Sequence, residues 1–298
     1  RRIMKILFTG AYGQLGNELK DLSADFEERN FVFTDVDSLN ITQKEDVEVF
    51  FNREKPEFVV NCAAYTAVDK AESEPEKARL LNAVAPSYLA SAARATGARM
   101  IHISTDYVFD GAANTPYAEE DMENPQGVYG KTKWEGEKLC LEVNPSTLII
   151  RTSWLYSSYG NNFVKTMLRL GNERDLLKVV FDQAGTPTYA ADLARAIFSV
   201  IADLANDAGT GKSGIYHYSN EGVLSWYDFA KTIFEISGLN CKVLPVLSEE
   251  FPTPAKRPHY SVLNKRKIRN TFQIDIPYWK QSLIACLTKI QKNSIDGK

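Results

Sequence analysis

The sequence lacks the features that would place it in a membrane, on a nucleic acid or around a metal ion. No apolar run approaches the roughly 20 residues that a membrane-spanning helix needs, so we expect no membrane association. The net charge of -3 argues against a general nucleic-acid binder, so we expect no nucleic-acid partner. The four cysteines lie far apart without a C-x-x-C pair, and with three scattered histidines they form no metal-ligand spacing. These absences predict a cytoplasmic protein with reduced thiols and no metal site.

What the sequence does contain is a regular alternation of strand and helix patterns. Strand patterns cover 5–8, 31–34, 58–60, 100–103 and 148–150, and helical patterns cover 17–22, 44–53, 75–96 and 129–143. Thr42 is a suitable N-cap for the second of these helices. The alternation predicts an α/β fold, a Rossmann-type doubly wound parallel sheet with a smaller, discontinuous α/β substrate domain.

The pattern changes after about residue 153, and this change suggests two domains. A helix at 190–204 and a strand at 214–218 are expected to return to the sheet. We therefore expect a dinucleotide-binding domain from residues 4–153 and 188–220. The substrate domain would take residues 154–187 and 221–291 and close over the cleft.

A glycine-rich turn follows the first strand pattern. The segment Thr9-Gly10-Ala11-Tyr12-Gly13-Gln14-Leu15-Gly16 stands between a strand and a helix. Glycines at 10, 13 and 16 permit a tight turn, close approach of the backbone to a pyrophosphate, and close packing of helix on strand. The pyrophosphate would lie at the positive end of the new helix. The turn predicts a dinucleotide site.

Asp35 ends the second strand pattern, about 20 residues past the glycines. A carboxylate there can bind both hydroxyls of the adenosine ribose and would repel a 2′-phosphate, which favours NADH over NADPH. A simple loop aspartate is the alternative interpretation.

Tyr129, Lys133 and Thr105 form a candidate acid–base group. Tyr129 and Lys133 are four apart on a predicted helix and therefore share a face, and Thr105 follows a buried strand. A lysine ammonium beside a phenol favours the phenolate and lowers a pKa that is ordinarily about 10. Such a group could exchange a proton with a carbonyl or an alcohol. A solvated Tyr–Lys pair is the alternative, but the dinucleotide motif upstream favours the catalytic interpretation.

Several segments resemble a known family. The glycine motif, Asn61-Cys62-Ala63-Ala64 and the Tyr129-x-x-x-Lys133 spacing look like those of extended short-chain dehydrogenases/reductases. Within that group the chain resembles the dTDP-4-dehydrorhamnose reductase family, in the segments Ala64–Asp69, Ser104–Phe109, Arg151–Trp154, Gly160–Phe163 and Pro252–His259. The resemblance runs from Met4 to about Ile290.

The resemblance implies reduction of the C4 ketone of dTDP-4-dehydro-β-L-rhamnose to dTDP-L-rhamnose, with NADH or NADPH as cofactor. By position, Tyr129 would donate the proton, and Lys133 would hold the nicotinamide ribose and tune the tyrosine. The expected cofactor residues are these two and Gly10, Gly13, Gln14, Leu15, Gly16, Asp35, Asn40, Ala63, Ala64, Tyr65 and Thr66. The expected substrate residues are Val68, Asp69, Thr105, Asp106, Tyr107, Trp154, Asn162, Phe163 and Arg257. The partner is a small dTDP-sugar, and the oligomeric state stays open, a homodimer included.

Two other functions stay open on the same scaffold. A nucleotide-sugar epimerase or 4,6-dehydratase would keep NAD bound, but related dehydratases have Asp-Glu after the threonine, whereas here Tyr107 follows Asp106. A non-catalytic NAD(P)-binding regulatory subunit would not need an intact Thr105, Tyr129 and Lys133. One departure from the family concerns Gly127, which stands where an asparagine is frequent and so leaves one polar contact in question.

Overall fold

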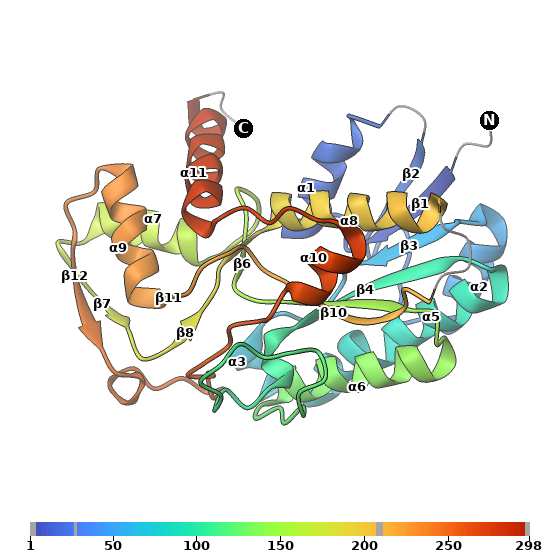
Figure 1. Ribbon diagram of the computed structural model, residues 1–298, viewed down its shortest axis with the longest axis horizontal. Helices are drawn as coiled ribbons and strands as arrows, with labels where there is room; N and C mark the ends of the chain where they lie inside the picture. Colours follow the sequence, from blue (N-terminus) through green and yellow to red (C-terminus); the bar gives the residue numbers. More distant parts are fainter. Residues whose placement is uncertain (1–3, 27–28, 207–210, 296–298) are drawn as a thin grey trace.

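Six parallel strands form the main sheet of the computed structural model, which describes residues 4–26, 29–206 and 211–295 (Figure 1). Neighbouring strands are in register, so that Phe8 lies opposite Phe33 on one side and Val60 on the other. In spatial order the strands are β10 (Gly214–Tyr218), β5 (Leu148–Thr152), β4 (Arg99–Thr105), β3 (Phe58–Asn61), β1 (Met4–Thr9) and β2 (Arg29–Thr34). The order runs outward from β1 in both directions, which confirms the predicted doubly wound sheet.

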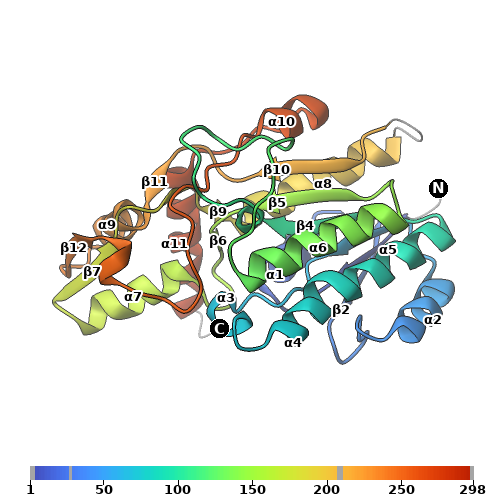
Figure 2. The same ribbon diagram turned by 90° about the horizontal axis from the view of Figure 1, so that it is seen from below.

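Helices cover both faces of this sheet because successive side chains of each strand point to opposite faces. Leu7 of β1 packs with Phe51 and Leu89 on one face, and Phe8 packs with Ile197 on the other. Figure 2 shows α5 and α6 on one side of the strands and α8 on the other. The first face carries α2 (Lys44–Glu54), α4 (Pro75–Arg79), a π-helical turn η1 (Leu80–Val84), α5 (Ala85–Thr96) and α6 (Val128–Val143). The second carries α1 (Gln14–Ser23), α8 (Ala190–Asn206) and α10 (Arg266–Phe272).

Two local predictions differ from the structure. The N-cap predicted at Thr42 is wrong, because α2 begins at Lys44 with Gln43 at the N-cap position and no side-chain capping bond. The Thr42 hydroxyl instead donates to Asn40 Oδ1 at 2.7 Å. The single helix predicted at 75–96 is interrupted by the π-helical turn between α4 and α5.

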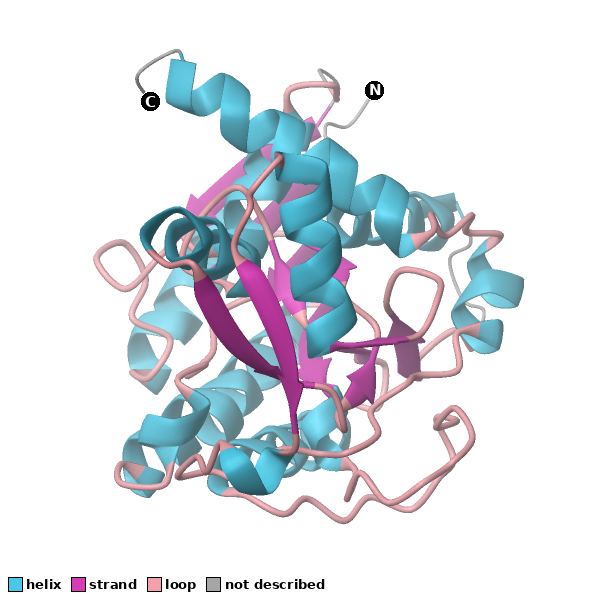
Figure 3. Cartoon of the chain, turned by 90° about the vertical axis from the view of Figure 1, so that its left-hand side faces the viewer, coloured by secondary structure: helices cyan, strands magenta, loops and turns pink. Residues whose placement is uncertain are grey.

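Most of the remaining elements pack as a smaller group at one end of the main sheet, on the left in Figure 1 and toward the viewer in Figure 3. The parallel pair β7 (Leu176–Val180) and β12 (Lys242–Val246) is covered by α7 (Phe163–Glu173) and α9 (Trp226–Ser237). Phe229 and Ile233 of α9 share a core with Leu283 of α11 (Trp279–Ile295). The short elements are β6 (Leu155–Tyr156) paired with β9 (Thr188–Tyr189), β11 (Leu224–Ser225) paired with β8 (Ala184–Gly185), α3 (Val68–Ala71), η2 (Asp106–Val108) and η3 (Ser248–Glu250). Within the described ranges, no helix combines the length and apolar character needed to cross a membrane.

Candidate active site

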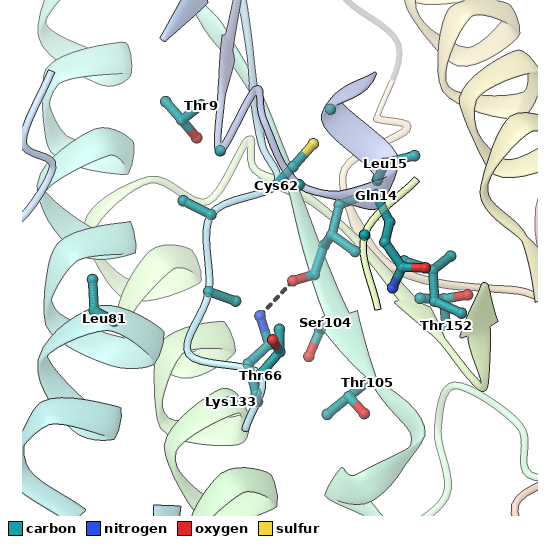
Figure 4. Close-up of a pocket in the computed structure, with 18 of the residues that line it drawn as sticks. Thr9, Gln14, Leu15, Cys62, Thr66, Leu81, Ser104, Thr105, Lys133 and Thr152 are labelled. Carbon is teal, nitrogen blue, oxygen red and sulfur yellow. Dashed lines mark hydrogen bonds between the residues drawn. The ribbon is translucent and has the colours of Figure 1, made fainter. Parts of the chain in front are cut away.

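A cavity of about 820 Å³ opens at the carboxyl ends of the parallel strands. Figure 4 shows Thr9, Cys62, Thr105 and Thr152 around it, at the ends of β1, β3, β4 and β5, together with Gln14 from the start of α1. The cavity lies where the strand order reverses between β1 and β3. Ligands of doubly wound sheets bind at this point.

The glycine turn between β1 and α1 forms one wall of the cavity. Gly10 has φ +66°, and a Cβ there would lie 2.6 Å from the backbone nitrogen of Ala63. A Cβ at Gly16 would overlap the carbonyl oxygen of Gly10. The helix α1 begins at Gln14, and Gly13 at its N-cap makes no side-chain capping bond. The first-turn N–H groups are thus available to a phosphate, and the turn fits the pyrophosphate of a dinucleotide.

Asp35 lies just after β2 and lines the same cavity. Its carboxylate accepts the backbone N–H of Tyr12 at 3.2 Å and that of Val36 at 2.8 Å. These two bonds hold the carboxylate beside the glycine turn. A carboxylate fixed there can accept the hydroxyl groups of a ribose, as the sequence predicts.

Thr105, Tyr129 and Lys133 come together on the cavity wall. The Thr105 hydroxyl donates to Asp106 Oδ1 at 3.0 Å, and Tyr129 is hydrogen-bonded to the same threonine. The ring of Tyr107 meets that of Tyr129 edge-on, with centroids 5.5 Å apart. Lys133 is 1% exposed and donates from Nζ to the carbonyl oxygen of Ile103 at 2.6 Å, the dashed line in Figure 4.

Burial dominates the acid–base behaviour of this group. It raises the pKa of the Tyr129 phenol above its ordinary value, while the hydrogen bond with Thr105 lowers that pKa. Burial also lowers the pKa of Lys133 to about 8, against the raising influence of the Glu137 carboxylate. The prediction that Lys133 lowers the tyrosine pKa is therefore not met in this structure, where Nζ bonds to a backbone carbonyl. Tyr129 is protonated at neutral pH and can serve as a proton donor.

Asp106 places a second buried acid in the cavity. It is 3% exposed, and its Oδ2 has no hydrogen-bond partner among the residues described. Burial raises its pKa to about 7, against hydrogen bonds from Thr105, Ser261 and backbone N–H groups. Near neutral pH this carboxyl group can therefore either donate to or accept from a ligand hydroxyl.

Trp154 gives the cavity an aromatic wall beside Val68 and Tyr107, which also line it. Its φ of +47° lies in the left-handed region, which a bulky side chain rarely adopts. The indole stacks on that of Trp226 from α9, with centroids 3.6 Å apart and planes inclined by 12°. An indole held in this way presents a fixed apolar surface.

The ion cluster around Arg151 anchors the helix that carries Tyr129 and Lys133. Arg151 on β5 is fully buried and bonds to both oxygens of Glu137 on α6, at 2.9 and 2.7 Å. Its third bond, at 2.6 Å, goes to Glu123. The cluster ties α6 to the sheet next to the cavity.

Five of the residues predicted to bind cofactor or substrate do not line the cavity. The Tyr65 hydroxyl donates to Glu74 at 2.6 Å. Asn162 caps α7 and donates to the side chain of Gln14 at 2.9 Å, and Phe163 packs on Trp226. Arg257 bonds to Asp69 at 2.7 Å, which joins the loop 252–259 to α3. All the other predicted site residues line the cavity.

The cavity is also lined by residues that are not among the predicted site residues. Five of them lie at or just after strand ends, the same signal that identified Thr105: Thr9, Cys62, Ser104, Thr152 and Ser153. Gly160 and Asn161 belong to the segment Gly160–Phe163 that resembles the family, and the others lie outside the segments of that resemblance: Val36, Leu39, Ile41, Leu81, Ile103 and Leu155. Across the described ranges, no group of three or more His, Cys, Asp or Glu side chains is placed to hold a metal ion.

Comparison with known proteins places the chain among sugar-nucleotide reductases. The family model described as "RmlD substrate binding domain" matches residues 4–292. A dTDP-4-dehydrorhamnose reductase of Aggregatibacter actinomycetemcomitans is 43% identical over 286 residues, which are 94% of this chain and 97% of that protein. The crystal structure of a dTDP-4-dehydrorhamnose reductase from Clostridium acetobutylicum is 48% identical, with TM-score 0.91 over 97% of this chain and all of that one. A Bacillus anthracis reductase of the same name, solved in complex with NADP, is 40% identical, with TM-score 0.91 and the same coverage.

Proposed function

We propose that this chain, which belongs to the RmlD substrate binding domain family, is an NADH- or NADPH-dependent dTDP-4-dehydrorhamnose reductase. It would reduce the C4 ketone of dTDP-4-dehydro-β-L-rhamnose to dTDP-L-rhamnose, in the formation of that sugar donor. The observation that carries the proposal is the junction, in one cavity, of a dinucleotide-type glycine turn with Thr105, Tyr129 and Lys133.

The cofactor would lie along the glycine turn, with Asp35 at its adenosine ribose and Lys133 at its nicotinamide ribose. When bound, it supplies the hydride that reduces C4. The Tyr129 phenol donates its proton to the C4 oxygen, while the Thr105 hydroxyl binds that oxygen and fixes its position. The phenolate left behind recovers its proton from solvent.

The substrate would lie on the other side of the cavity, between Asp106, Tyr107 and Trp154. We place its sugar against the Trp154 indole, and its diphosphate toward the loop 252–259, where Arg257 offers a guanidinium. Asn162 and Phe163 would support the nucleotide end through Gln14 and Trp226, which they contact. In this division residues 4–153 and 188–220 bind the dinucleotide, and residues 154–187 and 221–291 bind the nucleotide sugar.

We infer a cytoplasmic enzyme without a nucleic-acid partner, since the net charge is only -3 and the cysteines of the described chain are all free.

Oxidation of NADH or NADPH by the purified protein, with and without dTDP-4-dehydro-β-L-rhamnose, tests the proposal. Wild type should oxidise cofactor only when the sugar is present. Tyr129→Phe should keep cofactor binding and lose roughly 10²–10⁴-fold in turnover, because the forming alkoxide has no proton donor. Tyr278→Phe, at a half-exposed tyrosine, is the matched control and should behave as wild type. A Tyr129→Phe variant with near-wild-type turnover would remove Tyr129 from the mechanism.

A further inference from the structure

The helix that carries Tyr129 is capped by a residue from a distant segment. Gly127 occupies the N-cap position of α6, with φ -123° and ψ 170°, and offers no side-chain capping bond. The backbone N–H of Val128, the first residue of the helix, donates instead to Glu72 Oε1 at 2.8 Å. Glu72 directly follows α3, whose Val68 lines the cavity.

Gly127 is the residue that this arrangement requires. Its extended backbone conformation is open to any amino acid, so backbone strain does not explain the glycine. A Cβ at this position, however, would lie 2.8 Å from Glu72 Oε1, so a side chain would displace the carboxylate. Gly127 and Glu72 are therefore a matched pair, in which the missing side chain of one admits the carboxylate of the other.

The capped turn is also the turn that holds the phenol. Tyr129 is the second residue of α6, whereas Lys133 lies one turn further along and is held by the Ile103 carbonyl. The next residue, Gly130, packs so closely that a Cβ there would overlap the carbonyl oxygen of Tyr107. Because the first N–H groups of a helix have no partner within it, losing the cap loosens the first turn before any other.

We propose that Glu72 is a positioning residue for Tyr129. Glu72 caps α6 by accepting the N–H of Val128, and this bond keeps the phenol of Tyr129 against Thr105. This inference rests on the proposed role of Tyr129 as proton donor. The carboxylate also complements the positive end of the α6 dipole, which adds to its hold on the turn.

Three single variants test whether Glu72 acts through its hydrogen bond. Glu72→Ala should lower kcat about tenfold, the change that losing a cap of ordinary strength can produce, with KM for the sugar and Kd for NADH unchanged. Glu72→Gln should keep most of kcat, because its amide oxygen can accept the same N–H. Glu76→Ala, at an exposed glutamate of α4, is the control and should match wild type. Unchanged kcat in Glu72→Ala, or equal loss in Glu76→Ala, would overturn the proposal.

A double-mutant cycle with Gly127 tests the pairing itself. Gly127→Ser supplies a hydroxyl at the N-cap, where serine is among the strongest caps, and pushes the Glu72 carboxylate aside. In that background Glu72→Ala should cost nothing, since the turn has its own cap. The same loss of kcat from Glu72→Ala in both backgrounds would show that Glu72 acts by some route other than capping.

Amide hydrogen exchange tests the cap of α6 independently of the proposed function, because it needs no catalytic activity. In Glu72→Ala without ligands, exchange at residues 128–130 should become faster than in wild type, while exchange around Lys133 stays unchanged. Should wild type fail to reduce the dTDP-sugar, the proposed function is lost, yet exchange still decides whether Glu72 caps α6. Unchanged exchange at 128–130 would refute the cap, and faster exchange with unaltered kcat would refute the positioning role.

Discussion

Asp35 is the residue that we expect to decide between the two nicotinamide cofactors. Its carboxylate is fixed by the backbone N–H groups of Tyr12 and Val36 and would repel a 2′-phosphate. Wild type should therefore use NADH at least as well as NADPH, and Asp35→Ala should shift the preference toward NADPH. The measurement is kcat/KM for both cofactors in wild type, in Asp35→Ala and in a control, Asp37→Ala, at an exposed aspartate two residues on. A strong wild-type preference for NADPH would mean that another side chain governs this pocket.

Asp106 should give the unliganded protein a recognisable pH dependence of stability. Burial raises its folded-state pKa from 3.8 to about 7, so the folded state holds a proton that the unfolded state has released between these pH values. The contribution of Asp106 to the free energy of unfolding is fully present below about pH 4 and is lost as the pH rises toward 7. The free energy of unfolding should fall by an amount on the order of 4 kcal/mol over this interval. Asp106→Asn cannot titrate and should lack this dependence.

Urea unfolding of wild type and Asp106→Asn from pH 4 to pH 8 checks this expectation. The free energy of unfolding of wild type, relative to that of the variant, should fall across the interval. A difference that stays flat or rises would show that Asp106 is ionised in the folded protein near its ordinary pKa.

Individual residues were predictable where a backbone position determines their place. Gly10, Asp35 and Thr105 could be found because strand ends of a parallel sheet meet at one edge. Side-chain partners could not be found in this way. Nothing in the local sequence indicates that Lys133 Nζ bonds to the Ile103 carbonyl, or that Tyr65 turns to Glu74, since these contacts depend on how distant segments pack.

At the scale of elements, the loop 252–259 contacts α3, a helix far from it in the sequence, and this contact can be tested. Its Arg257 side chain bonds to Asp69 at 2.7 Å and lies 3.5 Å from the hydroxyl of Tyr107, on the side of the cavity where we place the substrate. If Arg257 also binds the diphosphate, Arg257→Ala should weaken dTDP binding by about 1.5–3 kcal/mol, the usual range for a charged hydrogen bond. Affinity for NADH should not change, because we expect the dinucleotide to lie along the glycine turn.

Separate titrations with dTDP and with NADH test this contact. Lys256→Ala is the matched control and should do far less, because the exposed lysine next to Arg257 has no place in the proposed contact. Equal loss of both ligands in Arg257→Ala would indicate a disturbed fold. Undiminished dTDP binding would make Arg257 a residue that only pairs with Asp69.

Helices, strands and caps could be predicted where the sequence signal is local, and the predictions failed where it is not. Alternating apolar strands and amphipathic helices identified the elements that form the main sheet and its layers. The cap predicted at Thr42 failed because the threonine hydroxyl has a competing acceptor, Asn40, two residues earlier. The cap that matters most for the site, from Glu72 to α6, joins residues 56 apart and leaves no local signal.

At the scale of the whole molecule, the sheet follows from the sequence while the shape of the cavity does not. Parallel strands joined by helices have few right-handed, doubly wound arrangements, so the strand order was largely constrained. The proposed substrate side depends on how the smaller group of elements packs against the sheet, as in the Trp154–Trp226 stack between the segment that follows β5 and α9. The contacts between the smaller group and the sheet join residues far apart in the chain, and sequence patterns do not specify such contacts.

As a whole, the molecule is a net reductase, not an epimerase or dehydratase that recycles a bound NAD. Tyr107 follows Asp106 where a dehydratase of the related type has a glutamate, so the base for dehydration is missing. A reductase must transfer hydride from cofactor that exchanges with solution at every turnover. An epimerase or dehydratase returns the hydride to the same sugar and consumes no cofactor.

Isotope transfer from NADH deuterated at both C4 positions of the nicotinamide tests this claim most directly. With dTDP-4-dehydro-β-L-rhamnose as substrate, the product should be dTDP-L-rhamnose carrying a single deuterium at C4 of the sugar, identified by mass spectrometry and proton NMR. One NAD⁺ should appear for each sugar reduced. A sugar product without deuterium, or one altered at other carbons with no net oxidation of NADH, would contradict the account.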